Sequence, residues 1–380
     1  MSPREEPPVW WTTQDAAVAA KAKLPPGVWD FIDGGAGAET TVRGNVEEFA
    51  KVRLRPRVLN DVSDVDTRIR LLGDEHADSG LELAAPIMVA PTAPQTVADA
   101  GGESATAAAS TELGLAMVAS AMAGHTIEQI SATATDRRRI WQQLYLFRDR
   151  GITTDLAARA EACGAGALVV TVDSPWLGRR LRNLRNGFRI PAGISPHNLA
   201  ASLSAAPDVS SVEDYSQTVM DPSLTWRDLE ALTGSTGLPV WVKGILTGED
   251  TKRAIDSGVA GVIVSNHGGR QLDRAIPTLR ALPEVVAVAG DVPVLMDGGI
   301  RSGTDVVIAL ALGARAVLLG RPVLWGLAAA GEEGVRAILS LLIEEMVDAM
   351  GQAGYARITD LDASLIAEPG TAYGRAWTTA

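Results

Sequence analysis

The sequence has a single cysteine, Cys163, which excludes an internal disulfide and a metal site built from several cysteines. Histidine is also scarce. His76, His125, His197 and His267 are the four in the chain, and no two of them stand four residues apart or in an HExxH arrangement. We therefore expect no metal in the functional site.

Long apolar runs are missing as well. No stretch of about 20 apolar residues is present, as a membrane-spanning helix would need. The first residues, 1–6, carry charges instead of the apolar core of a signal peptide. We expect a cytoplasmic protein that does not contact a membrane.

The sequence also lacks an excess of positive charge. Its 34 lysines and arginines stand against 46 aspartates and glutamates, for a net charge of -12. Nucleic-acid binding needs a basic surface, so nucleic acid is excluded as a partner. An acidic substrate would have to be held by a few local cations.

What the sequence does have is a regular alternation of short apolar strands and helical segments. Near-continuous apolar strands indicate burial on both faces, hence a parallel sheet, and eight such units predict a closed (β/α)8 barrel. A doubly wound open sheet is the alternative, disfavoured because no GxGxxG turn opens the first unit. The predicted strands are 87–90, 116–119, 140–145, 167–172, 239–243, 261–264, 293–296 and 316–319.

We interpret residues 1–380 as one domain, with the barrel at about 84–350. The segment before residue 80 is expected to form a helical and hairpin-like cap. After the fourth strand the chain runs through serine, alanine and proline with little periodicity, and such a long loop predicts a lid at 192–225. Residues 368–380 are expected to form a loose tail.

The most informative motif is SNHGGRQLD at 265–273, directly after the apolar run 261–264. His267 can accept a proton near neutral pH, and Arg270 can bind a carboxylate through two parallel hydrogen bonds. The glycines between them let backbone and ligand approach closely. A base and an anion-binding cation in one short turn indicate an acid substrate that reacts at its α-carbon.

Polar residues follow the other strands, at the end where such barrels carry their chemistry. The glycine-bearing turns after the last two strands stand where barrels commonly bind phosphate, which predicts a phosphorylated cofactor. Taken singly, most of these residues have a plain structural reading; Asp173, for example, could be a helix cap. Lys243 is harder to explain that way, because burying an unpaired ammonium is costly.

In combination, these motifs resemble the FMN-dependent α-hydroxy-acid oxidases and dehydrogenases, the family of glycolate oxidase, lactate oxidase and mandelate dehydrogenase. The resemblance covers most of the chain, and so many spaced matches do not arise by chance. The matching segments are LPPGVWDF (24–31), APTA (90–93), QLY (143–145), TVDSP (171–175), LGRR (177–180), VKG (242–244), SNHGGRQLD (265–273), DGGIRSGTDV (297–306) and LGRP (319–322).

The resemblance implies FMN as the cofactor and a homotetramer as the assembly. Lys243 would lie against the part of the flavin where negative charge develops on reduction. The other residues that the resemblance implies for FMN are Pro91, Thr92, Ala93, Ser120, Gln143, Thr171 and Ser265, with the phosphate on Asp297, Gly298, Gly299, Arg301, Gly320 and Arg321.

The resemblance also implies the catalytic set. His267 would be the base, with Asp173 steadying its imidazolium form. Arg180 and Arg270 would bind the substrate carboxylate, and Tyr145 would hydrogen-bond the α-hydroxyl. The reaction is then oxidation of an α-hydroxy acid to the α-keto acid, by loss of either a hydride or first a proton.

Departures from the family pattern narrow the range of expected substrates. Phe31 replaces a tyrosine that helps hold the carboxylate in glycolate- and lactate-type members. Together with the segment 175–188, it looks closest to the 4-hydroxymandelate and mandelate oxidase branch, and Trp176 is expected in the pocket. Pro94 replaces a larger residue, and Asp99-Ala100 replaces a histidine-proline pair; both changes are expected beside the cofactor.

We therefore predict oxidation of an aryl (S)-α-hydroxy acid, mandelate or 4-hydroxymandelate, with O2 or another acceptor reoxidising the flavin. One alternative is a short-chain oxidase or monooxygenase of the lactate or glycolate type. A second, from another class, is a flavin-binding barrel without turnover. His267 and Arg270 argue against the latter, because a binding module needs neither a base nor a carboxylate clamp.

Overall fold

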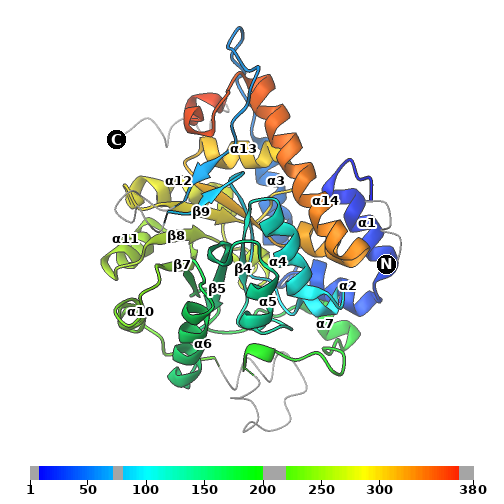
Figure 1. The fold of residues 1–380 in the computed structure, drawn as a ribbon, viewed down its shortest axis with the longest axis vertical. Coiled ribbons are helices and arrows are strands. Elements are labelled where there is room, and N and C mark those ends of the chain that lie inside the picture. The colour runs from blue at the N-terminus through cyan, green and yellow to red at the C-terminus, as the bar shows by residue number, and fades with distance from the viewer. Residues whose placement is uncertain (1–7, 72–79, 200–219, 368–380) are drawn as a thin grey trace.

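The computed structural model describes residues 8–71, 80–199 and 220–367. Eight parallel strands close into a barrel in the order β10-β3-β4-β5-β6-β7-β8-β9 (Figure 1). The predicted (β/α)8 barrel is thus confirmed, and the open-sheet alternative is wrong. The strands are β3 (Ile87–Val89), β4 (Ala116–Ala119), β5 (Ile140–Leu144), β6 (Leu168–Thr171), β7 (Val240–Ile245), β8 (Gly261–Val264), β9 (Val294–Asp297) and β10 (Ala316–Leu319).

Helices follow the strands and form the outer layer of the barrel. Local side chains set where several of them begin: Ser302 Oγ accepts the backbone N–H of Asp305, whose carboxylate accepts the N–H of Ser302, a capping box. The helices are α4 (Gly102–Glu112), α5 (Ile127–Thr133), α6 (Arg150–Ala162), α7 (Leu181–Asn186), α10 (Trp226–Thr233), α11 (Gly248–Asp256), α12 (Thr278–Ala289), α13 (Gly303–Ala311) and α14 (Arg321–Ala353). Single helical turns are η2 (Gln95–Val97), η3 (Arg137–Arg139), η4 (His197–Leu199), η5 (His267–Gly269), η6 (Ile358–Asp360) and η7 (Ala363–Leu365).

Side chains alternate along each strand between the barrel interior and the helix layer. The interior is filled by side chains that include Trp141 and Trp241, which are fully buried with their rings 5.1 Å apart. A Cβ at Gly261 would come within 2.1 Å of the Trp241 ring, so only glycine fits there. Because the interior is closed by large apolar groups, polar chemistry is confined to the strand ends.

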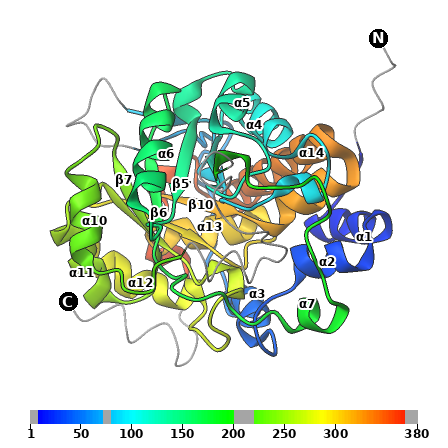
Figure 2. The same cartoon turned by 90° about the horizontal axis from the view of Figure 1, so that it is seen from below.

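The segment before the barrel forms the predicted N-terminal helical cap. It consists of α1 (Thr13–Lys23), α2 (Pro26–Asp33) and α3 (Thr40–Lys51), followed by β1 (Ile69–Arg70), which pairs antiparallel with β2 (Glu82–Leu83). Helix α1 lies beside α14 in both views (Figures 1 and 2). The end of α2 reaches the carboxyl ends of the strands, which brings cap residues to the site.

The connection after β6 is long, as predicted, and contains α7 and η4. Of the predicted lid at 192–225, residues 200–219 lie outside the described residues, as does the predicted tail at 368–380. None of the helices in the described ranges has both the length and the apolar character needed to cross a bilayer.

Candidate active site

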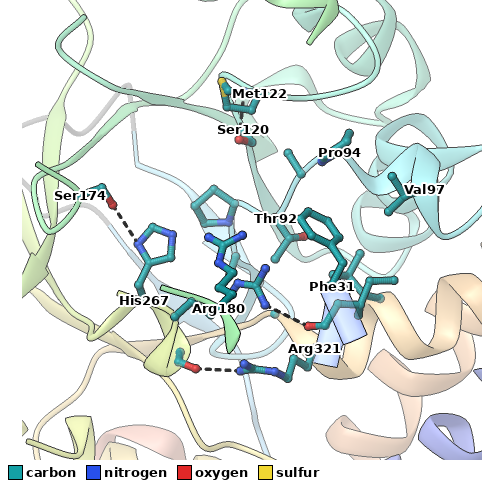
Figure 3. A pocket seen from close by; sticks show the side chains of 18 of the residues that line it. Phe31, Thr92, Pro94, Val97, Ser120, Met122, Ser174, Arg180, His267 and Arg321 are labelled. Carbon is teal, nitrogen blue, oxygen red and sulfur yellow. Dashed lines mark hydrogen bonds between the residues drawn. The ribbon is translucent and has the colours of Figure 1, made fainter. Parts of the chain in front are cut away.

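A cavity of about 840 Å³ opens at the carboxyl ends of the strands. Its walls come from the barrel loops, the end of α2 and the segment after α7. Figure 3 shows part of this lining, with Phe31 from α2 opposite His267. Sixteen residues singled out from the sequence line it: Phe31, Pro91, Thr92, Ala93, Ser120, Tyr145, Arg180, Lys243, His267, Arg270, Asp297, Gly298, Gly299, Arg301, Gly320 and Arg321.

Four further predicted residues lie directly behind this wall. Gln143 is buried on β5, where its side-chain oxygen accepts hydrogen bonds from Ser120 Oγ and from the Ala121 N–H. Thr171 pairs with Lys243 across β6 and β7. The other two, Asp173 and Ser265, bind cavity residues directly. The fold therefore gathers the whole predicted set at one place.

His267 and Asp173 form a hydrogen-bonded pair, with 2.9 Å between His267 Nδ1 and Asp173 Oδ1. Ser174 Oγ lies 3.4 Å from the same nitrogen (Figure 3). Burial alone would raise the pKa of Asp173, but the charge of His267 and the hydrogen bond to it outweigh burial and lower that pKa. Asp173 is thus a carboxylate that fixes the ring through Nδ1 and leaves Nε2 for another partner.

The backbone at His267 is strained. His267 has a φ of 58° in η5, a left-handed conformation that costs a non-glycine residue free energy. The surroundings hold it there: its N–H donates to Ser265 Oγ at 3.0 Å, and Asn266 accepts the Gly269 N–H at 3.1 Å. Gly244 (φ 113°) packs so closely on Asp173 that a Cβ would lie 2.7 Å from it. Both partners of the pair are therefore placed by backbone that few sequences would allow.

Lys243 is a buried and paired cation. Its Nζ lies 2.9 Å from Asp297 Oδ2 and donates to Ser265 Oγ at 2.7 Å. Burial favours the neutral amine, but the charges of Asp297 and Asp173 outweigh it and raise the pKa of Lys243. A fixed positive charge thus stands at the end of β7.

Two arginines flank an aromatic ring on the other side of the cavity. The guanidinium carbons of Arg180 and Arg270 lie 6.0 and 5.5 Å from the centre of the Phe31 ring. Phe31 stacks on Phe188 at 4.8 Å, which fixes the ring. Arg270 Nη1 donates to the carbonyl of Gly34 at 2.6 Å, while burial, together with the charge of Arg180, lowers its pKa. Arg270 is therefore oriented by the cap.

Two more arginines lie near the glycine turns after β9 and β10. Arg321 donates to the carbonyls of Asp33, Gly34 and Gly268, each at 2.9 Å. Arg301 stacks over Trp325 at 4.9 Å and donates to its neighbour's carbonyl. Burial and the charge of Arg321 lower the pKa of Arg301 to about 10. Such desolvated guanidiniums are suited to bind an anion bidentately.

Tyr145 follows β5 and packs edge-on against Phe147 at 5.9 Å. Burial, with the nearby charge of Asp173, raises the pKa of Tyr145 to about 12. The phenol is therefore a proton-bearing group at neutral pH, which can donate a hydrogen bond into the cavity.

Two expectations about the wall need correction. Trp176 does not line the cavity: the residue is 70% exposed, because residues 175 and 176 turn outward at the rim. Asp99 does not line it either; its carboxylate accepts the Gly101 N–H at 2.8 Å in the turn before α4. Pro94 does face the cavity, as expected (Figure 3).

The sequence predicted a lid at 192–225 but did not show which residues in and before it line the cavity. Arg189 and residues 190–196 line one side, together with Met220. They belong to the aperiodic connection after β6, where no pattern marks which residues turn inward. Backbone carbonyls at the end of α2 were also missed, because any residue type supplies a carbonyl.

The family model for FMN-dependent dehydrogenases matches residues 20–368. The chain belongs to this family. The 4-hydroxymandelate oxidase of Amycolatopsis orientalis is 45% identical, covering 90% of this chain and 93% of the relative. The L-lactate oxidase of a Nostoc strain is 43% identical, covering 91% and 95%. A structure of mandelate oxidase with (S)-4-hydroxymandelic acid matches with a TM-score of 0.87 at 43% identity, covering 94% of this chain and 98% of that one.

The chain is therefore an FMN-dependent 2-hydroxy-acid oxidase homologue, and its cofactor is FMN. The cavity fits that group. Gln143 Nε2 and Asp297 Oδ1 are buried without a hydrogen-bond partner among the described residues, and buried polar atoms need one. A Cβ at Gly320 would meet nothing nearer than 3.6 Å, which leaves its backbone open to a ligand beside Arg321.

Proposed function

We propose that this protein oxidises an aryl (S)-2-hydroxy acid to the 2-keto acid and passes the electrons to dioxygen. The observation that carries the proposal is that His267, which is paired with Asp173, lines the same cavity as Arg180, Arg270 and Phe31. A base, an anion clamp and an apolar ring together suit an acid with an aryl group on its reacting carbon. Bound FMN supplies the two-electron acceptor.

His267 is the proposed base. Because Nδ1 is held by Asp173 at 2.9 Å, Nε2 is the nitrogen that takes the substrate proton. The proton comes from the hydroxyl if the α-hydrogen leaves as hydride, and from the α-carbon if a carbanion forms. In both cases the carboxylate of Asp173 stabilises the imidazolium that results.

Arg180 and Arg270 are proposed to hold the substrate carboxylate. Both lie over the Phe31 ring, and charge-assisted pairs between a guanidinium and a carboxylate are short and directional. Tyr145, which stays protonated below a pKa of about 12, would donate to the α-hydroxyl. The substrate is thereby oriented with its reacting carbon toward His267.

The remaining predicted residues are proposed to hold FMN. Lys243 would stabilise negative charge on the reduced ring, and Arg301 with Arg321 would bind the phosphate. The others are proposed to contact the cofactor through backbone or side-chain hydrogen bonds: Pro91, Thr92, Ala93, Ser120, Gln143, Thr171, Ser265, Asp297, Gly298, Gly299 and Gly320.

The aryl assignment rests on the apolar part of the wall and on the relatives. Phe31, Pro94, Val97, Met122 and Leu177 all line the cavity. Two of the similar proteins are named for mandelates. The competing proposal, a short-chain oxidase, is supported by the similar L-lactate oxidase. A tetrameric assembly and a cytoplasmic location stay predictions.

The experiment is the anaerobic visible spectrum of the purified holoprotein after addition of each acid in turn. The acids are (S)-mandelate, (R)-mandelate, 4-hydroxymandelate, L-lactate and glycolate. Bleaching by the S form of mandelate but not by the R form supports the proposal. Bleaching by lactate or glycolate alone would replace it with the short-chain reading, and a spectrum that no acid bleaches would favour a barrel without turnover.

The acceptor is tested separately. When air is admitted to the reduced protein, dioxygen as acceptor predicts one hydrogen peroxide per keto acid formed. Rapid reoxidation with that ratio supports an oxidase. A flavin that stays reduced in air for many turnover times would point to another electron acceptor.

A further inference from the structure

One short segment, Ile32–Gly37, connects three parts of the site, and we call it the hub segment. Its carbonyls accept hydrogen bonds from Arg270 and Arg321. Its N–H groups donate to the carbonyls of Gly269 and Arg179, each at 2.9 Å. The loops after β6 and β8 and the start of α14 therefore all take their position from the same six residues.

Arg182, on α7, binds the acidic side chains of this region. Its Nη1 lies 3.0 Å from Asp33 Oδ2, and its Nη2 lies 2.6 Å from Glu39 Oε2. Asp30 is a third carboxylate at 3.7 Å. Arg182 does not line the cavity, and about a third of its side chain is exposed. Arg182 is therefore near the site but does not contact the cavity in which a ligand would bind.

The two carboxylates have an electrostatic influence on the cavity. Burial lowers the pKa of both Arg270 and Arg321, and the charges of Asp33 and Glu39 act against that lowering. Those carboxylates are therefore close enough to attract the same guanidiniums that would bind anions. In the structure neither Arg270 nor Arg321 has a carboxylate within 4.0 Å among the described residues, and Asp33 and Glu39 are paired with Arg182.

We propose that Arg182 is a positioning residue that keeps Asp33 and Glu39 from competing for Arg270 and Arg321, so that both arginines stay available for anionic ligands. The inference rests on the proposed function, since it takes the substrate carboxylate and the FMN phosphate as those anions. It assigns a role in ligand affinity to an ion-pair cluster outside the cavity.

The test compares Arg182→Gln with Arg185→Gln. Arg185 is exposed on the same helix and has no ion pair with any of the described residues, so its substitution removes the same charge alone. Two properties of the holoprotein are measured. The first is the Kd of phenylacetate, a carboxylate without an α-hydroxyl, which is followed by the change in the flavin spectrum. The second is the fraction of FMN released on dilution, which is followed by FMN fluorescence. We expect Arg182→Gln to weaken phenylacetate binding about tenfold, equivalent to about 1.4 kcal/mol, and to increase FMN release; Arg185→Gln should change neither.

A rescue variant separates competition from loss of structure. Adding Asp33→Asn and Glu39→Gln to Arg182→Gln removes the competing charges. The Gly35 N–H donates to Glu39 at 3.0 Å, and the side-chain amide introduced by Glu39→Gln keeps an oxygen that can accept this hydrogen bond. Competition predicts that the triple variant binds phenylacetate within about threefold of wild type. If the triple variant stays as weak as Arg182→Gln, the cluster only tethers the chain and the proposal is wrong.

An Arg182→Gln protein with unchanged phenylacetate affinity and FMN release would also overturn the proposal. Neither readout requires turnover. If no hydroxy acid reduces the flavin of the wild-type protein, the proposed function fails, while both measurements on Arg182 still give their answer.

Discussion

The basic side chains of the cavity differ in how they are held. Lys243 is paired with the carboxylate of Asp297 at 2.9 Å, and His267 with that of Asp173 at the same distance. Arg270 and Arg321, in contrast, are held by backbone carbonyls, and no carboxylate among the described residues lies within 4.0 Å of either. We call Lys243 and His267, with their carboxylate partners, the paired or compensated side of the cavity, and Arg270 and Arg321 the arginine side.

This difference separates two tasks. A basic side chain that is paired with a carboxylate keeps its place whether or not a ligand is bound. A guanidinium held by carbonyls is oriented, but its charge is not neutralised, so an anion is strongly favoured beside it. Substitutions on the paired side should therefore change rates, and substitutions on the arginine side should change affinities.

The largest effect is expected for His267→Ala, on the paired side. Loss of the base should slow anaerobic flavin reduction by about 10²–10⁴-fold, the usual contribution of general-base catalysis. FMN should stay bound, because the arginines and Lys243 are unchanged. Stopped-flow reduction of the holoprotein measures the rate, and normal kinetics would remove His267 from the mechanism.

Arg270→Leu tests the other side. Removing one member of a buried charge pair costs about 2–5 kcal/mol, so we expect KM to rise about 100-fold with a smaller change in kcat. Arg280→Leu, which removes an exposed arginine from α12, is the charge control. An unchanged KM in steady-state assays of Arg270→Leu would place the carboxylate elsewhere.

Asp173→Asn asks whether the pairing itself matters. The amide keeps the size of the side chain but cannot stabilise the imidazolium, so we expect reduction to slow by about 10–100-fold at neutral pH. In a His267→Ala background the same change should have little further effect, because the two residues act as one unit. Additive losses in that double variant would mean that Asp173 acts independently of His267.

The compensated side was largely predictable from the sequence. Strand ends can be located from apolar runs, and a parallel barrel brings all of them to one face, so Lys243, His267 and Asp297 had to lie close together. The motifs around them also supported the family resemblance. Four predicted residues lie behind the cavity wall instead of lining it: Gln143, Thr171, Asp173 and Ser265. The pattern of a strand does not show how deeply a side chain at its end is buried.

The arginine side was less predictable. Arg270 and Arg321 are oriented by carbonyls of Ile32–Gly34, more than 200 residues away in the chain, and carbonyls leave no trace in residue type. The exposure of Trp176 was missed for another reason, since a loop without periodicity does not show which side chains turn inward.

Tyr145→Phe should have the smallest effect, and its pH dependence sharpens the comparison. The raised pKa, about 12, means that the phenol keeps its proton below that pH and would lose it only above. Loss of one hydrogen bond, about 0.5–1.5 kcal/mol, should lower kcat/KM by about 2–13-fold. Because the phenol does not titrate between pH 6 and 9, the ratio of wild type to variant should be constant over that range. A ratio that changes across it would show that Tyr145 exchanges a proton and belongs with the paired, rate-determining side.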